Sequence, residues 1–475
     1  MWSFLVMRND EKLGTASVGI DPKRTRYDLS SSFRIVVFTL EFTYSPFSGN
    51  GLYARSVVKS LLFSRKNQKN NCSIRVICGE PDPRLDGLSK NNHIRNDDNN
   101  LQLWPVDLPY KAGWKRLDEY GPWKEYSIGA YQKYSTKMNE FNPHVIMVID
   151  WHGAFAFREF RKSSPLIPVC YFNFRVYASS GIFNNSQWYQ EKEKDALEIA
   201  SDVICLSRGD KKSLQSLVDE LRKNQSISPC RPLLQVYLHH PALRGDMRDL
   251  AIKTFHNENH YTDENNNEDG NSTMPVSLDT SNRKYIICVV RLSEEKHPLL
   301  FVQVMERISA PVLSRLNIIP VLCGAASDPA YATICRDRLR KACPQSIIMD
   351  EFLGPQQLAN IFSNSIINFH PCLYDAFGMT CVEAAAFGAP SIINGNNTVG
   401  ATDLLGHGGC IQLDLTIPLD DLSNQVLQII KNPAYIQKVQ KEAYKQAMSW
   451  DEDASGKIIM ERLLYLASFD SPSDE

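Results

Sequence analysis

The 475-residue sequence lacks the features that mark membrane-spanning proteins and strongly basic nucleic-acid binders. No apolar run approaches the roughly 20 residues that a helix needs to cross a bilayer, so we expect no transmembrane segment. The 52 basic and 54 acidic side chains leave a formal net charge of −2. Because nucleic-acid binding depends largely on an excess of basic side chains that neutralise phosphates, this balance predicts no nucleic-acid partner.

Disulfide and zinc-binding patterns are also missing. The 12 cysteines are scattered without a Cys-x-x-Cys pair, and no histidine–cysteine group has the spacing of a zinc site. Several of them lie within apolar runs, as buried free thiols do: Cys78, Cys170, Cys205, Cys288 and Cys323. Scattered thiols of this kind suit a reducing compartment, so we expect a cytoplasmic protein.

The N-terminus carries no secretory signal pattern. Its apolar stretch, residues 2–7, is shorter than the about 7–15 residues of a signal core, and no basic segment precedes it. We therefore interpret residues 1–30 as an N-terminal extension and expect it to be disordered. The alternative for this stretch is an anchor on a membrane surface.

The sequence does contain a regular alternation of strand-length apolar runs and helix-length amphipathic segments. This alternation is typical of an α/β protein with mainly parallel sheets. In the first half it predicts strands at residues 34–40, 74–79, 144–149, 167–172, 203–206 and 233–236. In the second half it predicts strands at residues 284–290, 318–323, 346–349, 366–369 and 391–393. The main expected helices are residues 51–64, 123–141, 187–201, 210–222, 298–309 and 453–467.

Length and composition predict two doubly wound, Rossmann-like domains, each large enough to bury its own core. We expect the first at residues 31–255 and the second at residues 284–448, with a final helix and tail at 449–475. Between the domains, residues 256–283 are rich in Asn, Asp, Glu and Ser and bury too little apolar surface to order themselves. This composition predicts a flexible insertion, and a smaller Asn-rich insertion is expected at residues 89–100.

The most informative stretch is residues 369–393, which read FHPCLYDAFGMTCVEAAAFGAPSII. A short apolar run is followed by a turn with a glycine and then by a helix-forming segment. The first N–H groups of a helix have no partner within the helix, and its dipole is positive at that end. A phosphate can therefore bind to the backbone amides of Gly378, Met379 and Thr380.

Two acidic residues flank this expected helix start. Glu383 lies roughly 4–5 Å along the helix from Thr380, which would place it beside a ribose attached to the bound phosphate. Asp375, just before the turn, can accept hydrogen bonds from a sugar on the far side of a diphosphate. The plain alternative is an ordinary strand–loop–helix unit with an acidic cap.

Taken together, these residues resemble a known family. The acid, the turn and the helix end resemble the E-x7-E segment of retaining glycosyltransferases of family four, the glycogen-synthase and sucrose-synthase type: Asp375, Phe377-Gly378, Glu383-Ala384 and Gly388-x-Pro390. Residues 290–296 (VRLSEEK) resemble the GRL-x-x-EK segment of the same family. The resemblance implies the GT-B fold, in which an acceptor-side and a nucleotide-sugar-binding domain face each other across a cleft. It also implies that the last helix crosses back onto the first domain.

The resemblance implies transfer of a hexose from a nucleotide-diphosphate sugar to an acceptor hydroxyl with retention of configuration. Arg291 and Lys296 would neutralise the diphosphate without a metal, and Asp375 would contact the sugar. His152 would contact the transferred sugar or the acceptor. Further donor contacts are implied at glycine-containing loops and turns: Gly49, Gly51, Gly324, Phe377 and Gly378. The donor is expected to be UDP- or GDP-linked, with no resident cofactor, and the acceptor is left unspecified.

Several other interpretations remain open. Asp375 stands where the family usually has Glu, which supports a non-catalytic relative that keeps the fold as a scaffold. A third possibility is a sugar-nucleotide epimerase of the same fold. Residues 49–54 (GNGLYA) also fit a dinucleotide fingerprint, but they begin some nine residues after the strand instead of directly after it. The closest fit to the Asp-x-Asp of metal-dependent transferases, Asp451-Glu452-Asp453, is better explained as a helix cap.

Overall fold

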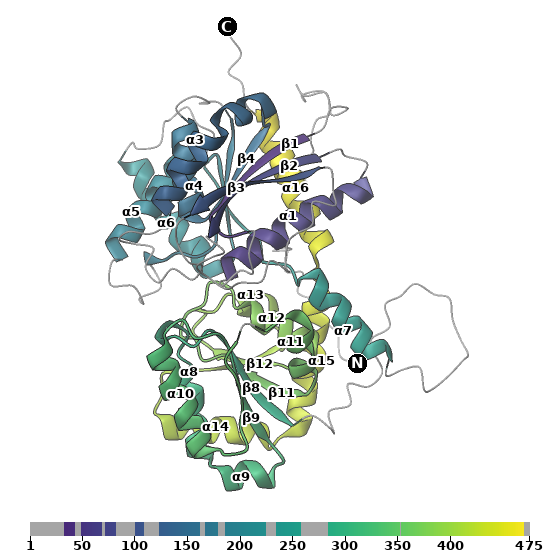
Figure 1. Ribbon diagram of the computed structural model, residues 1–475. Helices are drawn as coiled ribbons and strands as arrows, with labels where there is room; N and C mark the ends of the chain where they lie inside the picture. The colour runs from purple at the N-terminus through teal and green to yellow at the C-terminus, as the bar shows by residue number, and fades with distance from the viewer. Residues whose placement is uncertain are drawn as a thin grey trace, which may run out of the picture.

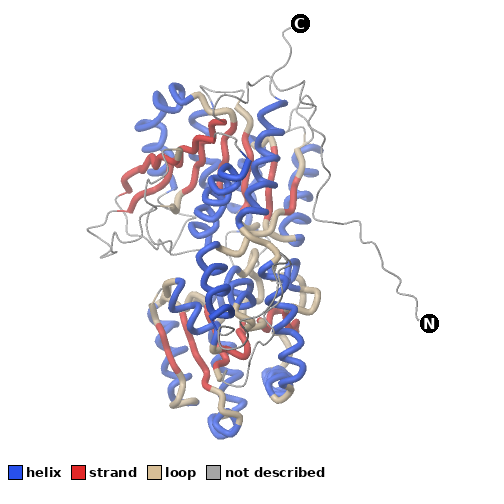
Figure 2. The backbone as a smooth tube through the Cα atoms, turned by 90° about the vertical axis from the view of Figure 1, so that its right-hand side faces the viewer, coloured by secondary structure: helices blue, strands red, loops and turns tan. Residues whose placement is uncertain are grey.

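The computed structural model describes residues 33–42, 49–68, 72–81, 100–108, 123–161, 167–178, 186–224, 234–257, 284–351 and 353–469. Figures 1 and 2 show two α/β units, one above the other, each built around a parallel sheet. The predicted N-terminal extension and most of both Asn-rich insertions lie outside the described residues. Within these ranges no helix is both long enough and apolar enough to cross a membrane.

The first unit contains a seven-stranded parallel sheet in the order β3-β2-β1-β4-β5-β6-β7. Its strands are β1 (Phe33–Thr39), β2 (Cys72–Pro81), β3 (Leu101–Leu108), β4 (Val145–Ile149), β5 (Val169–Asn173), β6 (Asp202–Cys205) and β7 (Val236–Leu238). The strand order reverses between β1 and β4, and doubly wound sheets bind ligands beyond the carboxyl ends of their strands at such a point.

Helices cover both faces of this sheet because successive side chains of each strand point to opposite faces. In β1, Ile35 and Val37 pack in one core, while Val36 and Phe38 pack in the other. The first core is covered by α1 (Gly49–Gln68) and by the terminal helix α16 (Glu452–Phe469). The second core is covered by α3 (Trp123–Phe141), α4 (Asp150–Arg161), α5 (Ser186–Ile199) and α6 (Arg208–Lys223).

The second unit contains a six-stranded parallel sheet in the order β10-β9-β8-β11-β12-β13. Its strands are β8 (Tyr285–Val289), β9 (Ile319–Cys323), β10 (Ile347–Met349), β11 (Ser365–Phe369), β12 (Ser391–Asn394) and β13 (Cys410–Leu413). One face packs against α8 (Pro298–Ile308), α10 (Pro329–Ala342) and α14 (Leu419–Ile430). The other packs against α11 (Pro355–Ser363), α12 (Met379–Ala386), α13 (Ala401–Leu405) and α15 (Pro433–Met448). The short helix α9 (Ala310–Arg315) follows α8.

The chain passes between the two units twice, near residue 243 and near residue 450, and these two segments lie side by side. Leu243 N donates to Trp450 O at 3.0 Å, and the indole N–H of Trp450 donates to His240 O at 2.9 Å. After this connection, α7 (Gly245–Asn257) packs against α11 and α12 of the second unit, while α16 lies along α1 of the first (Figure 1). The fit of α16 is close, since a Cβ at Gly456 would overlap the carbonyl oxygen of Ser60.

The predicted α/β class and the paired Rossmann-like sheets are confirmed, with differences at the sheet edges. The strands β3 and β13 were not predicted, and each is an outermost strand of its sheet. In β3, the polar residues Gln102 and Asp107 are exposed and interrupt the apolar run, and Pro105 is tolerated because an edge strand has unpaired groups. The last strand of the first unit, β7, lies at 236–238 and not at 233–236.

Several local predictions are confirmed. Pro298 occupies the first turn of α8, and Leu300 and Val304 are buried on its inner face. Asp451 caps α16, because its Oδ1 accepts a hydrogen bond from Ala454 N at 3.0 Å. The cysteines predicted to be buried free thiols are all buried and form no disulfide.

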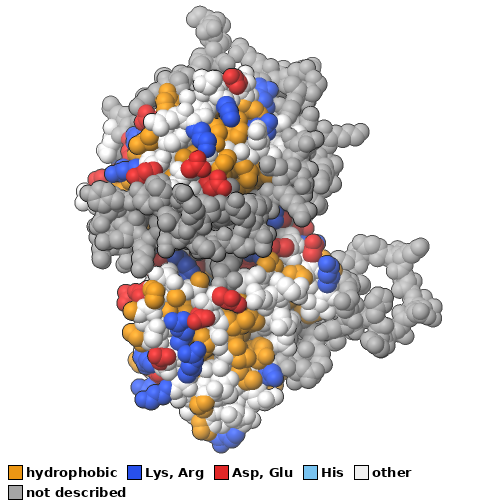
Figure 3. All heavy atoms as spheres, viewed as in Figure 1, with side chains coloured by type: hydrophobic (Ala, Val, Ile, Leu, Met, Phe, Trp, Pro, Cys, Tyr) orange, Lys and Arg blue, Asp and Glu red, His pale blue; other side chains and the backbone are white. Residues whose placement is uncertain are grey.

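On the face shown in Figure 3, basic, acidic and hydrophobic side chains are interspersed over both units.

Candidate functional site

The loops at the carboxyl ends of the two sheets meet at the junction of the units. Arg175, after β5, contacts Glu295, after β8, with 2.6 Å between Nη1 and Oε1. Tyr374, after β11, donates its hydroxyl to Asp210 Oδ1 of α6 at 2.9 Å. Since parallel sheets present their ligand sites at this end, the junction is where the expected site residues should gather.

The start of α12 has the geometry that the sequence predicts. The strand β11 is followed by a loop and then by Gly378, which caps α12 with φ of 83°. This left-handed conformation is open to glycine without strain. A Cβ at Gly378 would also lie only 3.3 Å from Val399 and 3.6 Å from His370 Nε2. The half-buried residues Met379 and Thr380 form the first turn, whose backbone N–H groups are available to an anion.

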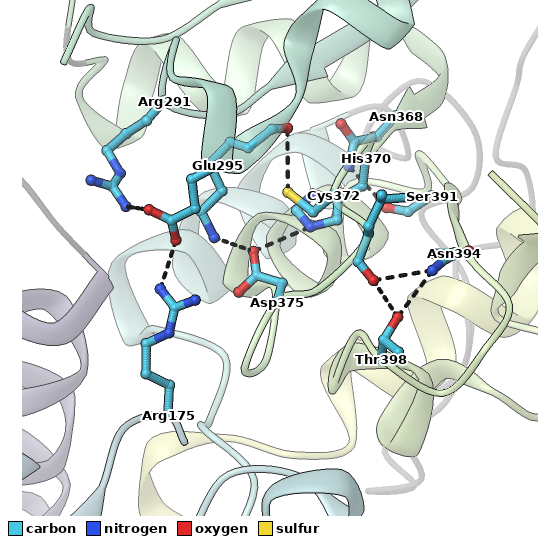
Figure 4. Close-up of polar contacts among 12 residues, drawn as sticks. Arg175, Arg291, Glu295, Asn368, His370, Cys372, Asp375, Ser391, Asn394 and Thr398 are labelled. Carbon is cyan, nitrogen blue, oxygen red and sulfur yellow. Dashed lines mark hydrogen bonds and ion pairs between the residues drawn. The ribbon is translucent and has the colours of Figure 1, made fainter. Parts of the chain in front are cut away.

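Lys296 and Asp375 lie together beside this helix start. Lys296 ends the turn Glu294–Lys296, and its Nζ lies 2.8 Å from Asp375 Oδ2. The same carboxylate oxygen is 3.2 Å from His370 Nε2 (Figure 4). Burial alone would raise the pKa of Asp375, but Lys296 and His370 hold it well below its usual value. The carboxylate is therefore ionised at neutral pH, as is the ammonium beside it, whose pKa is raised mainly by Asp375 against the effect of burial.

Arg291 is held in place by Glu295. Its Nη2 lies 3.4 Å from Glu295 Oε2, and the other oxygen of Glu295 pairs with Arg175 of the first unit. Figure 4 shows the carboxylate of Glu295 between the two guanidinium groups. Burial would raise the pKa of Glu295, but Arg175, Lys296 and Arg291 together lower it to about 2. Arg291 is the more accessible of the two predicted diphosphate cations, with 35% of its side chain exposed.

Glu383 lies within α12 and faces the first unit. Its Oε1 is 3.3 Å from Nη1 of Arg244, and both side chains are almost fully buried. Burial raises the pKa of Glu383, and Arg244 opposes part of that rise. The carboxylate expected to bind ribose is thus held by an arginine that the sequence analysis did not identify.

His152 belongs to a buried polar cluster at the carboxyl end of β4. The side-chain amide of Asn50 is hydrogen-bonded to His152, with 3.1 Å between Nδ2 and Nε2. Tyr177 donates its hydroxyl to Asp150 Oδ2 at 2.9 Å, and Asp150 has a φ of 61° at the start of α4. Burial lowers the pKa of His152 to about 3, so the ring is neutral at physiological pH. No hydrogen bond or ion pair among the described residues joins His152 to Asp375.

Gly49 and Gly51, two of the glycines expected to contact the donor, do not use the backbone freedom that glycine permits. Both residues lie in the first turn of α1, and among the described glycines a positive φ occurs only elsewhere in the chain. Gly49 instead matters for space, because a Cβ there would lie 3.1 Å from the ring of Phe174. Gly324 does need to be glycine, since its φ is 149° and a Cβ would overlap the carbonyl oxygen of Val290.

Phe377 contributes to the junction and not to an open binding surface. Its buried ring stacks on His240 of the first unit, with 5.9 Å between ring centroids and an interplanar angle of 24°. A direct contact between this side chain and a donor is therefore not supported by the geometry. Its backbone still forms the turn that leads into α12.

One group of possible metal ligands was missed from the sequence. Ligand atoms of His370, Cys372 and Asp375 lie within 4.8 Å of one another, and a His-x-Cys-x-x-Asp spacing would have identified them. Imidazole, thiolate and carboxylate are all zinc ligands. However, the ammonium of Lys296 already lies 2.8 Å from Asp375 Oδ2. A divalent ion about 4 Å from that ammonium would be repelled by on the order of 8 kcal/mol, so the group fits an ammonium better than a metal.

One known family model matches the second unit. Residues 272–446 match the family model described as Glycosyl transferases group 1. The match includes Arg291, Lys296, Asp375 and Glu383. No curated protein matches the chain in sequence.

Solved structures match nearly the whole chain. Sucrose-phosphate synthase from Thermosynechococcus elongatus is 13% identical with a TM-score of 0.65, over 92% of this chain and 100% of that chain. The α,α-trehalose 6-phosphate synthase from Burkholderia multivorans is 13% identical with a TM-score of 0.65, and the match covers 93% of this chain and 100% of that chain. HepE from Anabaena, in complex with UDP and glucose, is 13% identical with a TM-score of 0.60, and the match covers 91% of this chain and 99% of that chain. The chain therefore has the GT-B fold.

Proposed function

We propose that the protein is a glycosyltransferase that moves a hexose from a nucleotide-diphosphate sugar to an acceptor hydroxyl, with retention of configuration. The observation that carries this proposal is the Lys296–Asp375 ion pair of 2.8 Å beside the left-handed Gly378 that starts α12. The family match over residues 272–446 supports the same assignment. UDP and glucose in the structure of HepE, a protein of similar fold, support a nucleotide-sugar donor.

In this proposal each part of the junction binds one part of the donor. The diphosphate lies against the amides of Gly378, Met379 and Thr380 and is neutralised by Arg291 and Lys296. The ribose hydroxyls donate to Glu383 in the same helix. The nucleotide is UDP or GDP, and no metal is needed because two cationic side chains replace it.

Asp375 binds the sugar, and this is consistent with its low pKa. A carboxylate that stays ionised is the better acceptor for sugar hydroxyls. His152, neutral and buried, would contribute a hydrogen bond to the sugar or the acceptor, not a positive charge. The shorter Asp side chain, in place of Glu, would move the sugar about one methylene closer to the backbone of the loop.

The reaction breaks the bond between the anomeric carbon and the β-phosphate oxygen and forms a bond to the acceptor oxygen on the same face of the sugar. The bonding electrons leave with the diphosphate, and the proton of the acceptor hydroxyl passes to the departing phosphate oxygen. Charge therefore builds up on the diphosphate in the transition state. Arg291, Lys296 and the α12 amides are positioned to stabilise that charge, which is commonly the largest catalytic contribution.

The test is a turnover assay with a panel of UDP-, GDP- and ADP-sugars, each with and without a mixture of sugar and lipid-linked acceptors. Release of nucleoside diphosphate that depends on an acceptor supports the proposal, and the anomeric configuration of the product tests retention. Sugar interconversion without an acceptor would instead indicate an epimerase. Binding without any turnover would indicate a scaffold protein. The scaffold alternative is favoured by one observation, since Asp375 and Glu383 are both already paired with cations of the chain itself.

A further inference from the structure

Arg244 is a buried arginine of the first unit that reaches into the second. It lies one residue before α7, and its Nη1 is 3.3 Å from Glu383 Oε1. Only 11% of the Arg244 side chain and 5% of the Glu383 side chain are exposed. In such surroundings a charge without a partner is costly, so each of the two side chains stabilises the ionised form of the other.

The rest of the Arg244 guanidinium is held by its own segment. Nε lies 3.0 Å from Asp246 Oδ1, and Nη2 lies 3.1 Å from Asp246 Oδ2. This two-bond contact uses one edge of the planar group and fixes its orientation. The remaining nitrogen, Nη1, is thereby directed at Glu383. A flexible lysine at the same position would keep the charge but lose this orientation.

The segment that carries Arg244 is itself anchored at the connection between the units. The preceding residue, Leu243, donates its N–H to Trp450 O at 3.0 Å. The following residue, Gly245, lies against Glu452, and a Cβ at Gly245 would be 2.8 Å from Glu452 Oε2. Arg244 is therefore held at a defined distance from α12 by both chain connections.

The Glu383 carboxylate keeps most of its hydrogen-bonding capacity in this arrangement. An ionised carboxylate has about four lone-pair sites. Arg244 lies within ion-pair distance of Oε1, but Oε1 is buried and has no hydrogen-bond partner among the described residues. Both carboxylate oxygens can therefore still accept hydrogen bonds from two ribose hydroxyls. The charged groups that act on Glu383 among the described residues are Arg244 and Asp246, of which only Arg244 favours ionisation.

We propose that Arg244 is a positioning residue that keeps the Glu383 carboxylate ionised and aimed at the ribose of the donor nucleotide. The inference rests on the proposed function, because it takes Glu383 as the ribose-binding group. Arg244 does not touch the donor in this scheme. It acts through Glu383, so all of its effect on nucleotide affinity should disappear once Glu383 is replaced.

The experiment measures binding of UDP and GDP by isothermal titration calorimetry to the full chain between pH 6 and pH 9. Arg244→Met should weaken binding of the preferred nucleotide about 10-fold to 100-fold at pH 7, the scale of a charged hydrogen bond. The loss should shrink as the pH rises, because Glu383 then ionises without its partner. Arg244→Lys should recover part of the affinity. In a Glu383→Gln background, Arg244→Met should have no further effect.

Arg248→Met is the matched control. Arg248 lies on α7 as well, but its partner is Asp451, with 3.6 Å between Nε and Oδ2. This variant should bind nucleotide like the unmodified protein. If Arg244→Met fails to fold, Arg244→Lys and its pH profile provide the test.

The outcomes separate this inference from the proposed function. If the unmodified chain binds neither UDP nor GDP, the inference about Arg244 and the proposed function are both overturned. If Glu383→Gln weakens binding and Arg244→Met does not, the role of Arg244 is overturned and the proposed function stands. A loss in Arg244→Met that is independent of pH, or that persists in the Glu383→Gln background, would show a general structural role and also overturn the inference.

Discussion

Arg175 Nη1 lies 2.6 Å from Glu295 Oε1, and this ion pair joins the first unit to the loop that carries Arg291. The Arg175 guanidinium also lies over the ring of Tyr177 and over the ring of Tyr374, at 5.1 and 5.3 Å from their centroids. Because the second oxygen of Glu295 pairs with Arg291, the position of a predicted diphosphate cation depends on how the two units dock.

Replacing Arg175 should lower the free energy of unfolding, because the buried Glu295 carboxylate then loses its 2.6 Å ion pair and keeps only its longer one with Arg291. We expect Arg175→Met to destabilise the protein by about 3–5 kcal/mol, measured as the shift of the urea unfolding curve. The double variant Arg175→Met/Glu295→Gln should be more stable than the single one, since no stranded charge remains. The control is Arg307→Met, which breaks an exposed pair with Asp420 and should cost less than about 1 kcal/mol. Equal effects of Arg175→Met and the control would contradict the buried role of the pair.

The acid dependence of stability should report the same pair. The pKa of Glu295 is about 2 in the folded protein, below the about 4.3 of an unfolded glutamate. Its contribution is therefore fully present above about pH 4.3 and is lost as the pH falls toward 2. Unfolding curves of the unmodified chain and of Glu295→Gln should differ most near pH 6 and converge near pH 2. A difference that stays constant over this range would show that Glu295 is not ionised in the folded state.

Removal of Arg291 should affect catalysis far more than folding. Arg291 is partly exposed, and its ion pair with Glu295 is long at 3.4 Å, so Arg291→Ala should leave the unfolding curve nearly unchanged. Loss of a group that stabilises transition-state charge typically reduces kcat by about 100-fold to 1,000-fold. Lys296→Met should cause a similar loss of turnover together with some instability, because it leaves Asp375 buried without its ammonium. Parallel losses of turnover and stability in Arg291→Ala would indicate a structural role.

Replacement of Glu383 should weaken binding of the nucleoside but not of the phosphates. We expect Glu383→Gln to reduce nucleotide affinity by about 1.5–3 kcal/mol, the usual range for a hydrogen bond to a charged group. Inorganic pyrophosphate, which has no ribose, should bind this variant and the unmodified chain equally well. Calorimetric titration with both ligands makes the comparison. Unchanged nucleotide affinity would remove Glu383 from the donor site.

Chelators should leave turnover intact. The group formed by His370, Cys372 and Asp375 contains metal-ligand types, but Lys296 neutralises its carboxylate. Activity measured after exhaustive EDTA treatment should equal that of the untreated protein, and added Mg²⁺ or Mn²⁺ should not raise it. A strict requirement for a divalent ion would contradict the scheme in which Arg291 and Lys296 neutralise the diphosphate.

Much of the fold could be predicted because hydrophobic periodicity records which faces of each element are buried. The meeting of Lys296 and Asp375, 79 residues apart, also follows from topology. Their loops follow β8 and β11, which are neighbours in the sheet, so the two loops emerge side by side. The family resemblance identified the segments, and the strand order explains why they meet.

The contacts between the units could not be predicted in this way. The pairs Arg175–Glu295 and Arg244–Glu383 depend on how the two sheets dock, and no periodic pattern within one segment encodes that orientation. The start of α1 at Gly49, two residues before the predicted helix, was missed for another reason. A glycine-rich sequence permits a loop but does not require one, and here Gly49 and Gly51 form the first turn of α1.

The most direct test is a crystal structure of the chain with the nucleoside diphosphate, UDP or GDP, that binds more tightly. We expect the diphosphate at the start of α12, within hydrogen-bonding distance of Lys296 and Arg291, and the ribose hydroxyls within hydrogen-bonding distance of Glu383. A nucleotide bound elsewhere, or one that leaves Arg291 and Lys296 directed away from its phosphates, would contradict this expectation.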